Sequence, residues 1–141
     1  MYRHDYILKM IERFGAALIS LRDKILRRSR EEIGVRAEIH EIAREAALDI
    51  GIARSLEPES LLMWLAPTGQ PDPAKLWLMA ELLYLEGLDS KASGGPDWQG
   101  DLQRALAILV TLPVEWRPGD AFTAAGERAE EIRQLLTVRA T

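Results

Sequence analysis

The stretch Leu76–Leu106, LWLMAELLYLEGLDSKASGGPDWQGDLQRAL, decides the fold of this chain. It contains two segments whose apolar residues recur at helical spacing, and the break Ser93–Pro96 separates them with two glycines and a proline. Two helices joined in this way cannot bury their own apolar faces and need neighbouring helices. The stretch therefore predicts a protein in which helices pack on one another.

Helical patterns also precede this stretch. Apolar residues step by three or four from Ile7 to Ile25, which predicts one long helix. The capping box Ser29–Glu32 predicts the start of a second helix, which we expect to continue to Ala53. The short connection between these helices predicts an N-terminal helical hairpin over residues 1–56.

Residues 57–112 are predicted to contain a short helix, Glu59–Ala66, and then the two helices of the opening stretch. Asp72 should cap the first of these two, because its side chain can accept a hydrogen bond from a free backbone N–H group. Pro73 should begin that helix, since proline suits the first helical position.

The last segment, residues 113–141, is predicted to be an irregular link and a C-terminal helix that Asp120 caps. No alternation of apolar and polar residues is long enough for a strand. The fold class is therefore all-α, with a single domain over residues 1–141. It has a long N-terminal helical hairpin, a short helix, a second helical hairpin and a C-terminal helix.

The composition limits the chemistry of the chain. Its 141 residues are 48% apolar and include no cysteine, which excludes disulfides, thiolate metal sites and a thiol nucleophile. His40 opens a sequence like the helical zinc-protease motif, but that motif needs a second histidine where Arg44 stands. We expect no catalytic residues, no cofactor and no metal. Apolar runs shorter than a membrane span and the missing cysteines favour a cytoplasmic protein.

Charge is distributed unevenly along the chain. The net charge is −4, but residues 1–30 carry eight Lys or Arg against three acidic residues, and the remainder carries ten against nineteen. The overall acidity does not suggest general nucleic-acid binding. Basic residues gather near the end of the first predicted helix, where they favour the helix dipole or could contact an anionic partner: Arg22, Lys24, Arg27, Arg28 and Arg30.

Three ordered segments carry a family resemblance: Asp5–Phe14, Pro58–Leu76 and Ala80–Leu106. Together they resemble an uncharacterised bacterial family of small all-helical proteins, a domain of unknown function with a tetratricopeptide-like hairpin. The resemblance implies a helical fold and self-association, but no activity. In the repeat pattern, Gly87 and Ala105 correspond to small residues where the two helices cross, and Gly94 to the turn. The alternative is that these residues only permit close packing.

We predict a non-enzymatic helical protein–protein interaction or scaffold module that forms a homodimer. Its other protein partner is not identified by the sequence. The alternative is a small regulatory adaptor whose basic N-terminal helix end contacts nucleic acid or an anionic membrane. Self-association is assigned to the apolar seam of the first helix, which exceeds what one short helix can cover: Ile7, Ile11, Phe14, Leu18, Leu21 and Ile25. The tryptophans, Trp77 among them, are expected to pack in the core or between helices; if one is exposed, we expect it to be Trp98 or Trp116.

Overall fold

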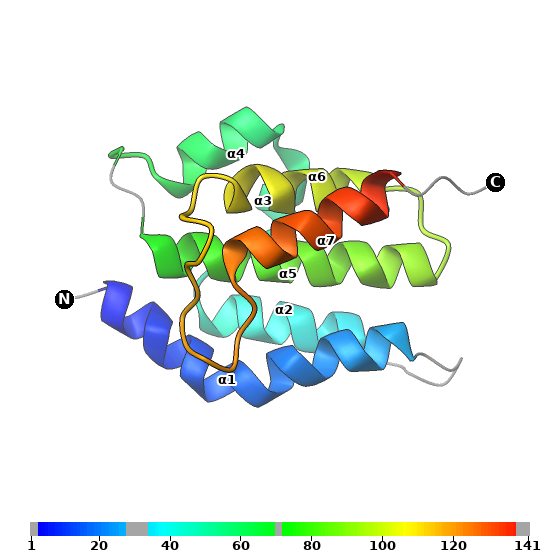
Figure 1. Ribbon diagram of the computed structural model, residues 1–141, viewed down its shortest axis with the longest axis horizontal. Coiled ribbons are helices and arrows are strands. Elements are labelled where there is room, and N and C mark those ends of the chain that lie inside the picture. The colour runs from blue at the N-terminus through cyan, green and yellow to red at the C-terminus, as the bar shows by residue number, and fades with distance from the viewer. Residues whose placement is uncertain (1–2, 28–33, 70–71, 138–141) are drawn as a thin grey trace.

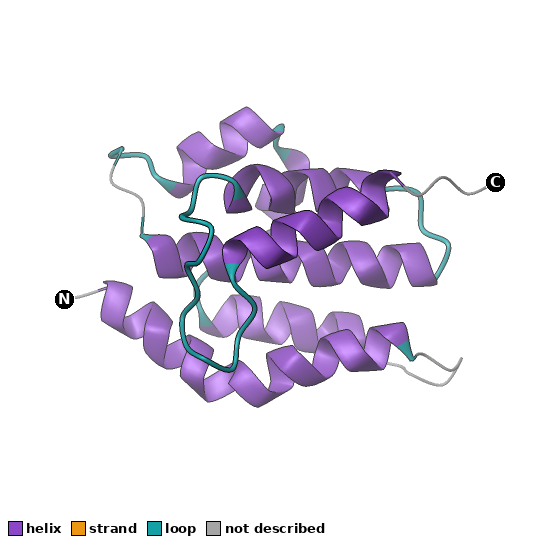
Figure 2. Cartoon of the chain, viewed as in Figure 1, coloured by secondary structure: helices purple, strands orange, loops and turns teal. Residues whose placement is uncertain are grey.

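The computed structural model describes residues 3–27, 34–69 and 72–137, and side chains from Tyr6 onward (Figure 1). Within these ranges every regular element is a helix and none is a strand (Figure 2), so the predicted all-α class is confirmed. The helices are α1 (Arg3–Leu26), α2 (Val35–Glu45), α3 (Ile50–Ser55), α4 (Pro58–Leu65), α5 (Pro73–Ala92), α6 (Trp98–Leu109) and α7 (Ala125–Thr137).

Helix α5 forms the centre of the molecule. Every residue from Leu76 to Ser90 is buried, on all sides of the helix. Figure 1 shows α1 and α2 on one side of α5, α6 on the other, and α7 across the front. The most extensive packing is with α6, which runs antiparallel to α5, and the next with α1. Because neighbouring helices cover α5 all round, apolar residues occur on every face of the helix.

The apolar seam of α1 faces this centre. Ile7, Ile11, Leu18, Leu21 and Ile25 are each at most 5% exposed, and Phe14 is half-buried against the same core. The expected surplus of exposed apolar surface along the seam is therefore not found, because helices of the same chain cover it. These side chains are not accessible to a second copy, so self-association requires another surface.

The second predicted helix is broken in two. Helix α2 ends at Glu45, and Ala47 adopts a left-handed conformation with φ of 58°. The N–H of Leu48 bonds to the carbonyl of Ala43 at 2.8 Å, which closes the turn as a Schellman motif. Asp49 then caps α3 by accepting a hydrogen bond from a backbone N–H. The predicted continuous helix is thus wrong, and the capping box Ser29–Glu32 lies outside the described residues.

Of the predicted starts of helices further along the chain, that of α5 is confirmed and that of α7 is wrong. The Asp72 side chain accepts a hydrogen bond from the N–H of Ala74 at 3.0 Å and Pro73 begins α5, so both predictions are confirmed. Asp120 does not cap α7, which begins five residues later. The link before α7 instead packs on the core: Phe122 lies edge-on to Trp77, with ring centroids 5.4 Å apart.

Candidate functional site

Three carboxylates lie on the buried helix α5. Glu81, Glu86 and Asp89 are each at most 6% exposed. A buried charge without partners is costly, by several kcal/mol or more, so groups on neighbouring helices must meet each carboxylate. Two clusters of ionic contacts result, one on each side of α5.

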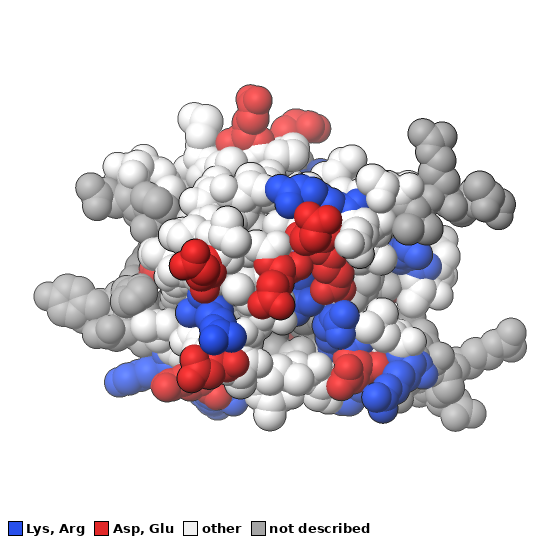
Figure 3. Space-filling view, viewed as in Figure 1, with Lys and Arg blue, Asp and Glu red and all other residues white. Residues whose placement is uncertain are grey.

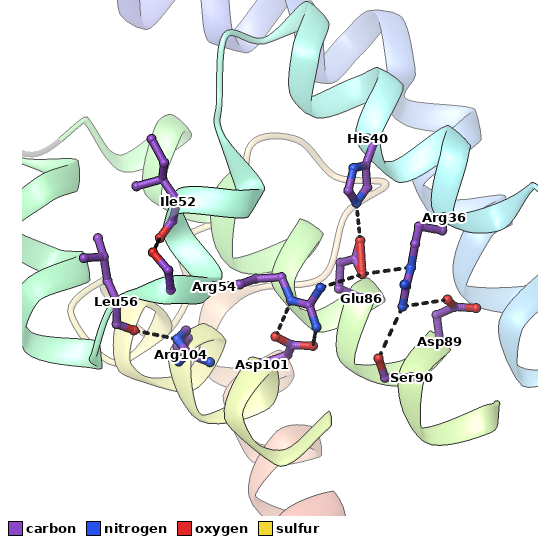
Figure 4. Close-up of polar contacts among 11 residues, drawn as sticks. Arg36, His40, Ile52, Arg54, Leu56, Glu86, Asp89, Ser90, Asp101 and Arg104 are labelled. Atoms are coloured by element: carbon purple, nitrogen blue, oxygen red, sulfur yellow. Dashed lines mark hydrogen bonds and ion pairs between the residues drawn. The ribbon is translucent and has the colours of Figure 1, made fainter. Parts of the chain in front are cut away.

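Glu86 is the centre of the first cluster. Its carboxylate is fully buried, and His40 Nε2 lies 2.7 Å from Oε2. Arg36 and Arg54 approach Oε1 at 3.5 and 3.8 Å, which are ion-pair distances. Oε1 accepts no hydrogen bond from any described residue, so the two guanidinium groups balance its charge. Figure 4 shows these side chains converging from α2 and α3. We call these four residues, together with three further partners of the two arginines, the Glu86 cluster: Arg36, His40, Arg54, Glu86, Asp89, Ser90 and Asp101.

The Glu86 cluster extends to helix α6 through Arg54. Arg54 donates two hydrogen bonds to the carboxylate of Asp101, at 2.8 and 3.1 Å, and Asp101 is 1% exposed. These bonds raise the pKa of Arg54 against the opposing effect of burial. Arg36 also lies 3.7 Å from Asp89 and donates to Ser90 at 3.4 Å. The cluster therefore ties α2, α3 and α6 to α5.

His40 is the member of the cluster that solvent reaches. Its side chain is about half exposed and lines a surface hollow of about 690 Å³ beside the turn before α3. A histidine held by a buried carboxylate resembles the arrangement of a general base. Here, however, the Glu86 carboxylate also neutralises Arg36 and Arg54. Its burial is therefore explained by its role in packing the helices together. Among the described residues, no group of three or more acidic or histidine side chains could hold a metal ion.

The second cluster joins α1, α5 and α7 around Arg128. Arg128 donates to both oxygens of Glu81, at 3.0 and 2.7 Å, and to Glu131 at 2.6 Å. Its guanidinium lies 4.1 Å from the ring centroid of Tyr84. The Tyr84 hydroxyl donates to Glu131 and accepts from Arg22 at 2.8 Å. We call Arg22, Glu81, Tyr84, Arg128 and Glu131 the Arg128 cluster.

Burial and charge set the protonation states in the Arg128 cluster. Burial raises the pKa of Tyr84, so the phenol stays protonated and can donate to Glu131. Burial tends to lower the pKa of Arg128. The charge and hydrogen bonds of the Glu81 carboxylate have a larger effect, so the pKa of Arg128 is raised overall. Burial also tends to raise the pKa of Glu131, yet the Tyr84 hydrogen bond and Arg128 lower it overall. At neutral pH, Arg128 and Glu131 are therefore charged, and Tyr84 is neutral.

The residues of the predicted helix crossing lie along the contact between α5 and α6. A Cβ atom added to Gly87 would stand 2.8 Å from Cδ2 and 3.0 Å from Cγ of Leu102 on α6. Ala105 is fully buried on α6. Gly94 lies in the turn between the helices with φ of 78°, in the left-handed region that glycine favours. All three are therefore at positions where a larger side chain meets strain or a neighbour.

The basic residues near the end of α1 are partly engaged within the chain. Arg22 pairs with Glu131 and Lys24 with Glu38, each at 3.2 Å. Arg27 is exposed, whereas Arg28 and Arg30 lie outside the described residues. Cations that already pair with acidic side chains contribute less to binding an external anion.

Helix α4 presents an apolar surface to solvent. Met63 is 73% and Trp64 is 37% exposed, although Leu61 and Leu65 of the same helix are buried. Figure 1 shows α4 at the outside of the molecule, where it packs on α6. Trp64 is more exposed than Trp98 and Trp116, which is the reverse of the sequence-based expectation. We call the outward residues Glu59, Ser60, Met63 and Trp64 the α4 face.

The partners within the two clusters are far apart in the sequence, and none was predicted. His40, for example, bonds to Glu86, which is 46 residues away. A signal was present: acidic residues inside a helix that is apolar all round must be buried and must have partners. The pattern of acidic residues does not indicate which arginines are their partners.

The fold and the two clusters define a helical protein built around a buried, charged central helix. Comparison of the chain with protein-family models, curated proteins and solved structures found no match. The resemblance to the bacterial family therefore stays a prediction. Of the helices described, none is both long and apolar enough to pass through a bilayer.

Proposed function

We propose that the protein is a non-enzymatic helical interaction module of the cytoplasm, and that the α4 face is its contact surface. The exposure of Met63 and Trp64 carries this proposal. A helix that is apolar on its outward as well as its inward side is normally covered on both. Tryptophan is a favoured anchor at protein interfaces, and methionine adapts to irregular partner surfaces.

The ionic clusters support a scaffold role. They link α1, α2, α3, α6 and α7 to α5, but neither includes a residue of α4. Helix α4 is instead held by apolar packing on α6, with Leu61 and Leu65 inward. The charged side chains thus fix a rigid body, in which α5 and α6 form the tetratricopeptide-like hairpin. This body presents α4 to a partner.

Hydroxyl-radical footprinting tests whether anything covers the α4 face. We expect Met63 and Trp64 to be oxidised more slowly in native cell lysate than in dilute purified protein. Tyr6 on α1, which is 46% exposed, serves as the internal reference. Equal oxidation relative to Tyr6 under both conditions would contradict the proposal.

The same footprint tests the alternative adaptor function. Duplex DNA or anionic vesicles are added to the purified protein at physiological salt. Protection of Leu26, which is 56% exposed at the end of α1, would favour an adaptor with a basic helix end. We expect no such protection, because Arg22 and Lys24 pair with acidic residues of the same chain.

A further inference from the structure

A cavity lies between α1 and α7, beside the Arg128 cluster. Its volume is about 320 Å³, at the lower end of the range for small-molecule sites. The lining residues come from α1, α5, α7 and the link before α7. Arg22 of α1 and Glu131 of α7 join the two helices at 3.2 Å, and both side chains line the cavity.

The buried part of the lining is a pair of charged side chains. Glu81 and Arg128, which are each 6% exposed, bind one another there. A carboxylate has about four lone-pair positions for hydrogen bonds. Glu81 accepts two hydrogen bonds from the described residues, both from Arg128. A carboxylate that is more than nine-tenths buried therefore lines the cavity and can accept a further hydrogen bond.

The exposed part of the lining is acidic. Asp23 on α1 and Glu127 on α7 are exposed, and neither carboxylate has a hydrogen bond or ion pair with a described residue. The lining contains two arginines and four carboxylates, so its net charge is −2. Figure 3 shows acidic side chains on the front of the molecule, where α7 and α1 lie in Figure 1. A cationic ligand would balance this charge.

Apolar groups complete the lining. Ile19 of α1, which is 46% exposed, and Phe122 of the link both contribute to it. A ligand that fits therefore combines positive hydrogen-bond donors with an apolar stem. A metal ion has no such stem, and no group of three or more acidic or histidine side chains among the described residues could hold one.

From this lining, we infer that the cavity binds a small aliphatic diamine. One ammonium group donates to Glu81 and Glu127, and the other to Asp23. The methylene chain lies against Ile19 and Phe122, where the hydrophobic effect favours it. A dication balances both unpaired carboxylates, whereas a monoamine leaves one of them unbalanced. The site lies on α1 and α7, so the inference is independent of the α4 face.

Isothermal titration calorimetry of the purified full chain with 1,4-diaminobutane tests this binding at neutral pH and physiological salt. We expect one saturable site with a dissociation constant on the order of 10 to 1,000 micromolar. Butylamine, which has one charge, should bind at least about tenfold more weakly. Mg²⁺ at the concentration of the diamine should not compete. Absence of saturable binding, or equal competition by Mg²⁺, would overturn the inference.

Neutral substitutions test the two exposed carboxylates. Asp23→Asn and Glu127→Gln should each weaken diamine binding about tenfold, because each removes one unbalanced charge. Glu130→Gln is the matched control, since Glu130 is also on α7 and is 61% exposed but does not line the cavity. Thermal unfolding without the diamine checks that each variant is folded. Equal affinities in the three folded variants would overturn the inference.

The position of the site is tested by NMR of the tryptophan indole groups. The indole N–H of Trp77 donates to the carbonyl of Thr123 at 3.1 Å, and Thr123 lines the cavity. Saturating diamine should therefore shift the Trp77 indole signal more than those of the other tryptophans, which do not line the cavity. An unchanged Trp77 signal at saturation would place the diamine elsewhere and overturn the assignment.

Discussion

Arg128 of α7 binds the carboxylate of Glu81 on α5 through two hydrogen bonds, and each side chain is 6% exposed. The pair therefore lies inside the protein although both groups are charged. A buried pair of this kind contributes little compared with apolar residues of similar size, but loss of one partner leaves an uncompensated charge. This asymmetry gives a direct test of its role.

We expect Arg128→Met to lower the free energy of unfolding by about 3–5 kcal/mol, because Glu81 would lose its bidentate partner. The double variant Glu81→Leu/Arg128→Met should recover most of that loss. Urea unfolding measures both. The exposed pair Arg133–Glu130 is the control, and Arg133→Met should change stability by less than about 0.5 kcal/mol. Equal losses in the single and double variants would show that the pair is not the cause.

Gly87→Leu should lower the free energy of unfolding by about 1–3 kcal/mol. The added side chain would overlap Leu102, which lies 2.8 Å from the position of a Cβ atom. Gly100→Ala on α6 is the control, because its Cβ would meet only the guanidinium group of Arg104. That change should be neutral or stabilising, since alanine favours a helix. An unchanged melting temperature for Gly87→Leu would refute the close crossing.

Ala47→Gly should raise the free energy of unfolding by about 0.5–1 kcal/mol. Ala47 occupies the left-handed position of a Schellman motif, where glycine has no steric penalty. Ala37→Gly provides the opposite control, because Ala37 is exposed inside α2 and should lose about 1 kcal/mol. Chemical unfolding of the two variants should therefore give shifts of opposite sign.

Glu131 should make stability depend on pH in the acid range. Its folded-state pKa is lowered by the Tyr84 hydrogen bond and Arg128, against the effect of burial. The unfolded chain therefore binds a proton more readily, and stability falls as the pH drops through the lowered pKa. Above about pH 5, beyond the unfolded value of about 4.3, the full contribution is present.

The measurement compares the wild type with Glu131→Gln by urea unfolding at several pH values. The difference between them should be constant near neutral pH and should shrink below about pH 5. Glu130→Gln, whose carboxylate is 61% exposed, should differ little from the wild type throughout. A difference that is independent of pH would indicate that Glu131 acts without its charge.

The fold class could be predicted because apolar spacing and helix caps are local signals. Asp72 and Pro73 begin α5 as expected from their neighbours alone. The break after α2 could not be predicted from the sequence, because Ala47 occupies the position where glycine usually marks a helix end. The prediction that Asp120 caps the C-terminal helix was wrong for a different reason. The link around Asp120 is shaped by the packing of Phe122 on Trp77, which is a tertiary contact.

The two clusters were harder to predict than the fold. The carboxylates of α5 signal that partners exist, but Glu81 meets Arg128 from 47 residues away. Only the arrangement of helices decides which arginine reaches which carboxylate. The seam of α1 shows the same limit, because sequence spacing identifies an apolar face without saying whether the same chain covers it.

The burial of α5 on all sides has a consequence for how the chain folds while the ribosome is making it. Helix α5 leaves the ribosome after α1 and α2 but before α6 and α7, and domains generally complete folding only when their parts are present. Until Arg128 has been added, Glu81 lacks its counter-charge and one side of an apolar helix faces water. A nascent chain arrested before α7 would therefore be a substrate for chaperones or proteases, and the addition of α7 would remove this exposed surface.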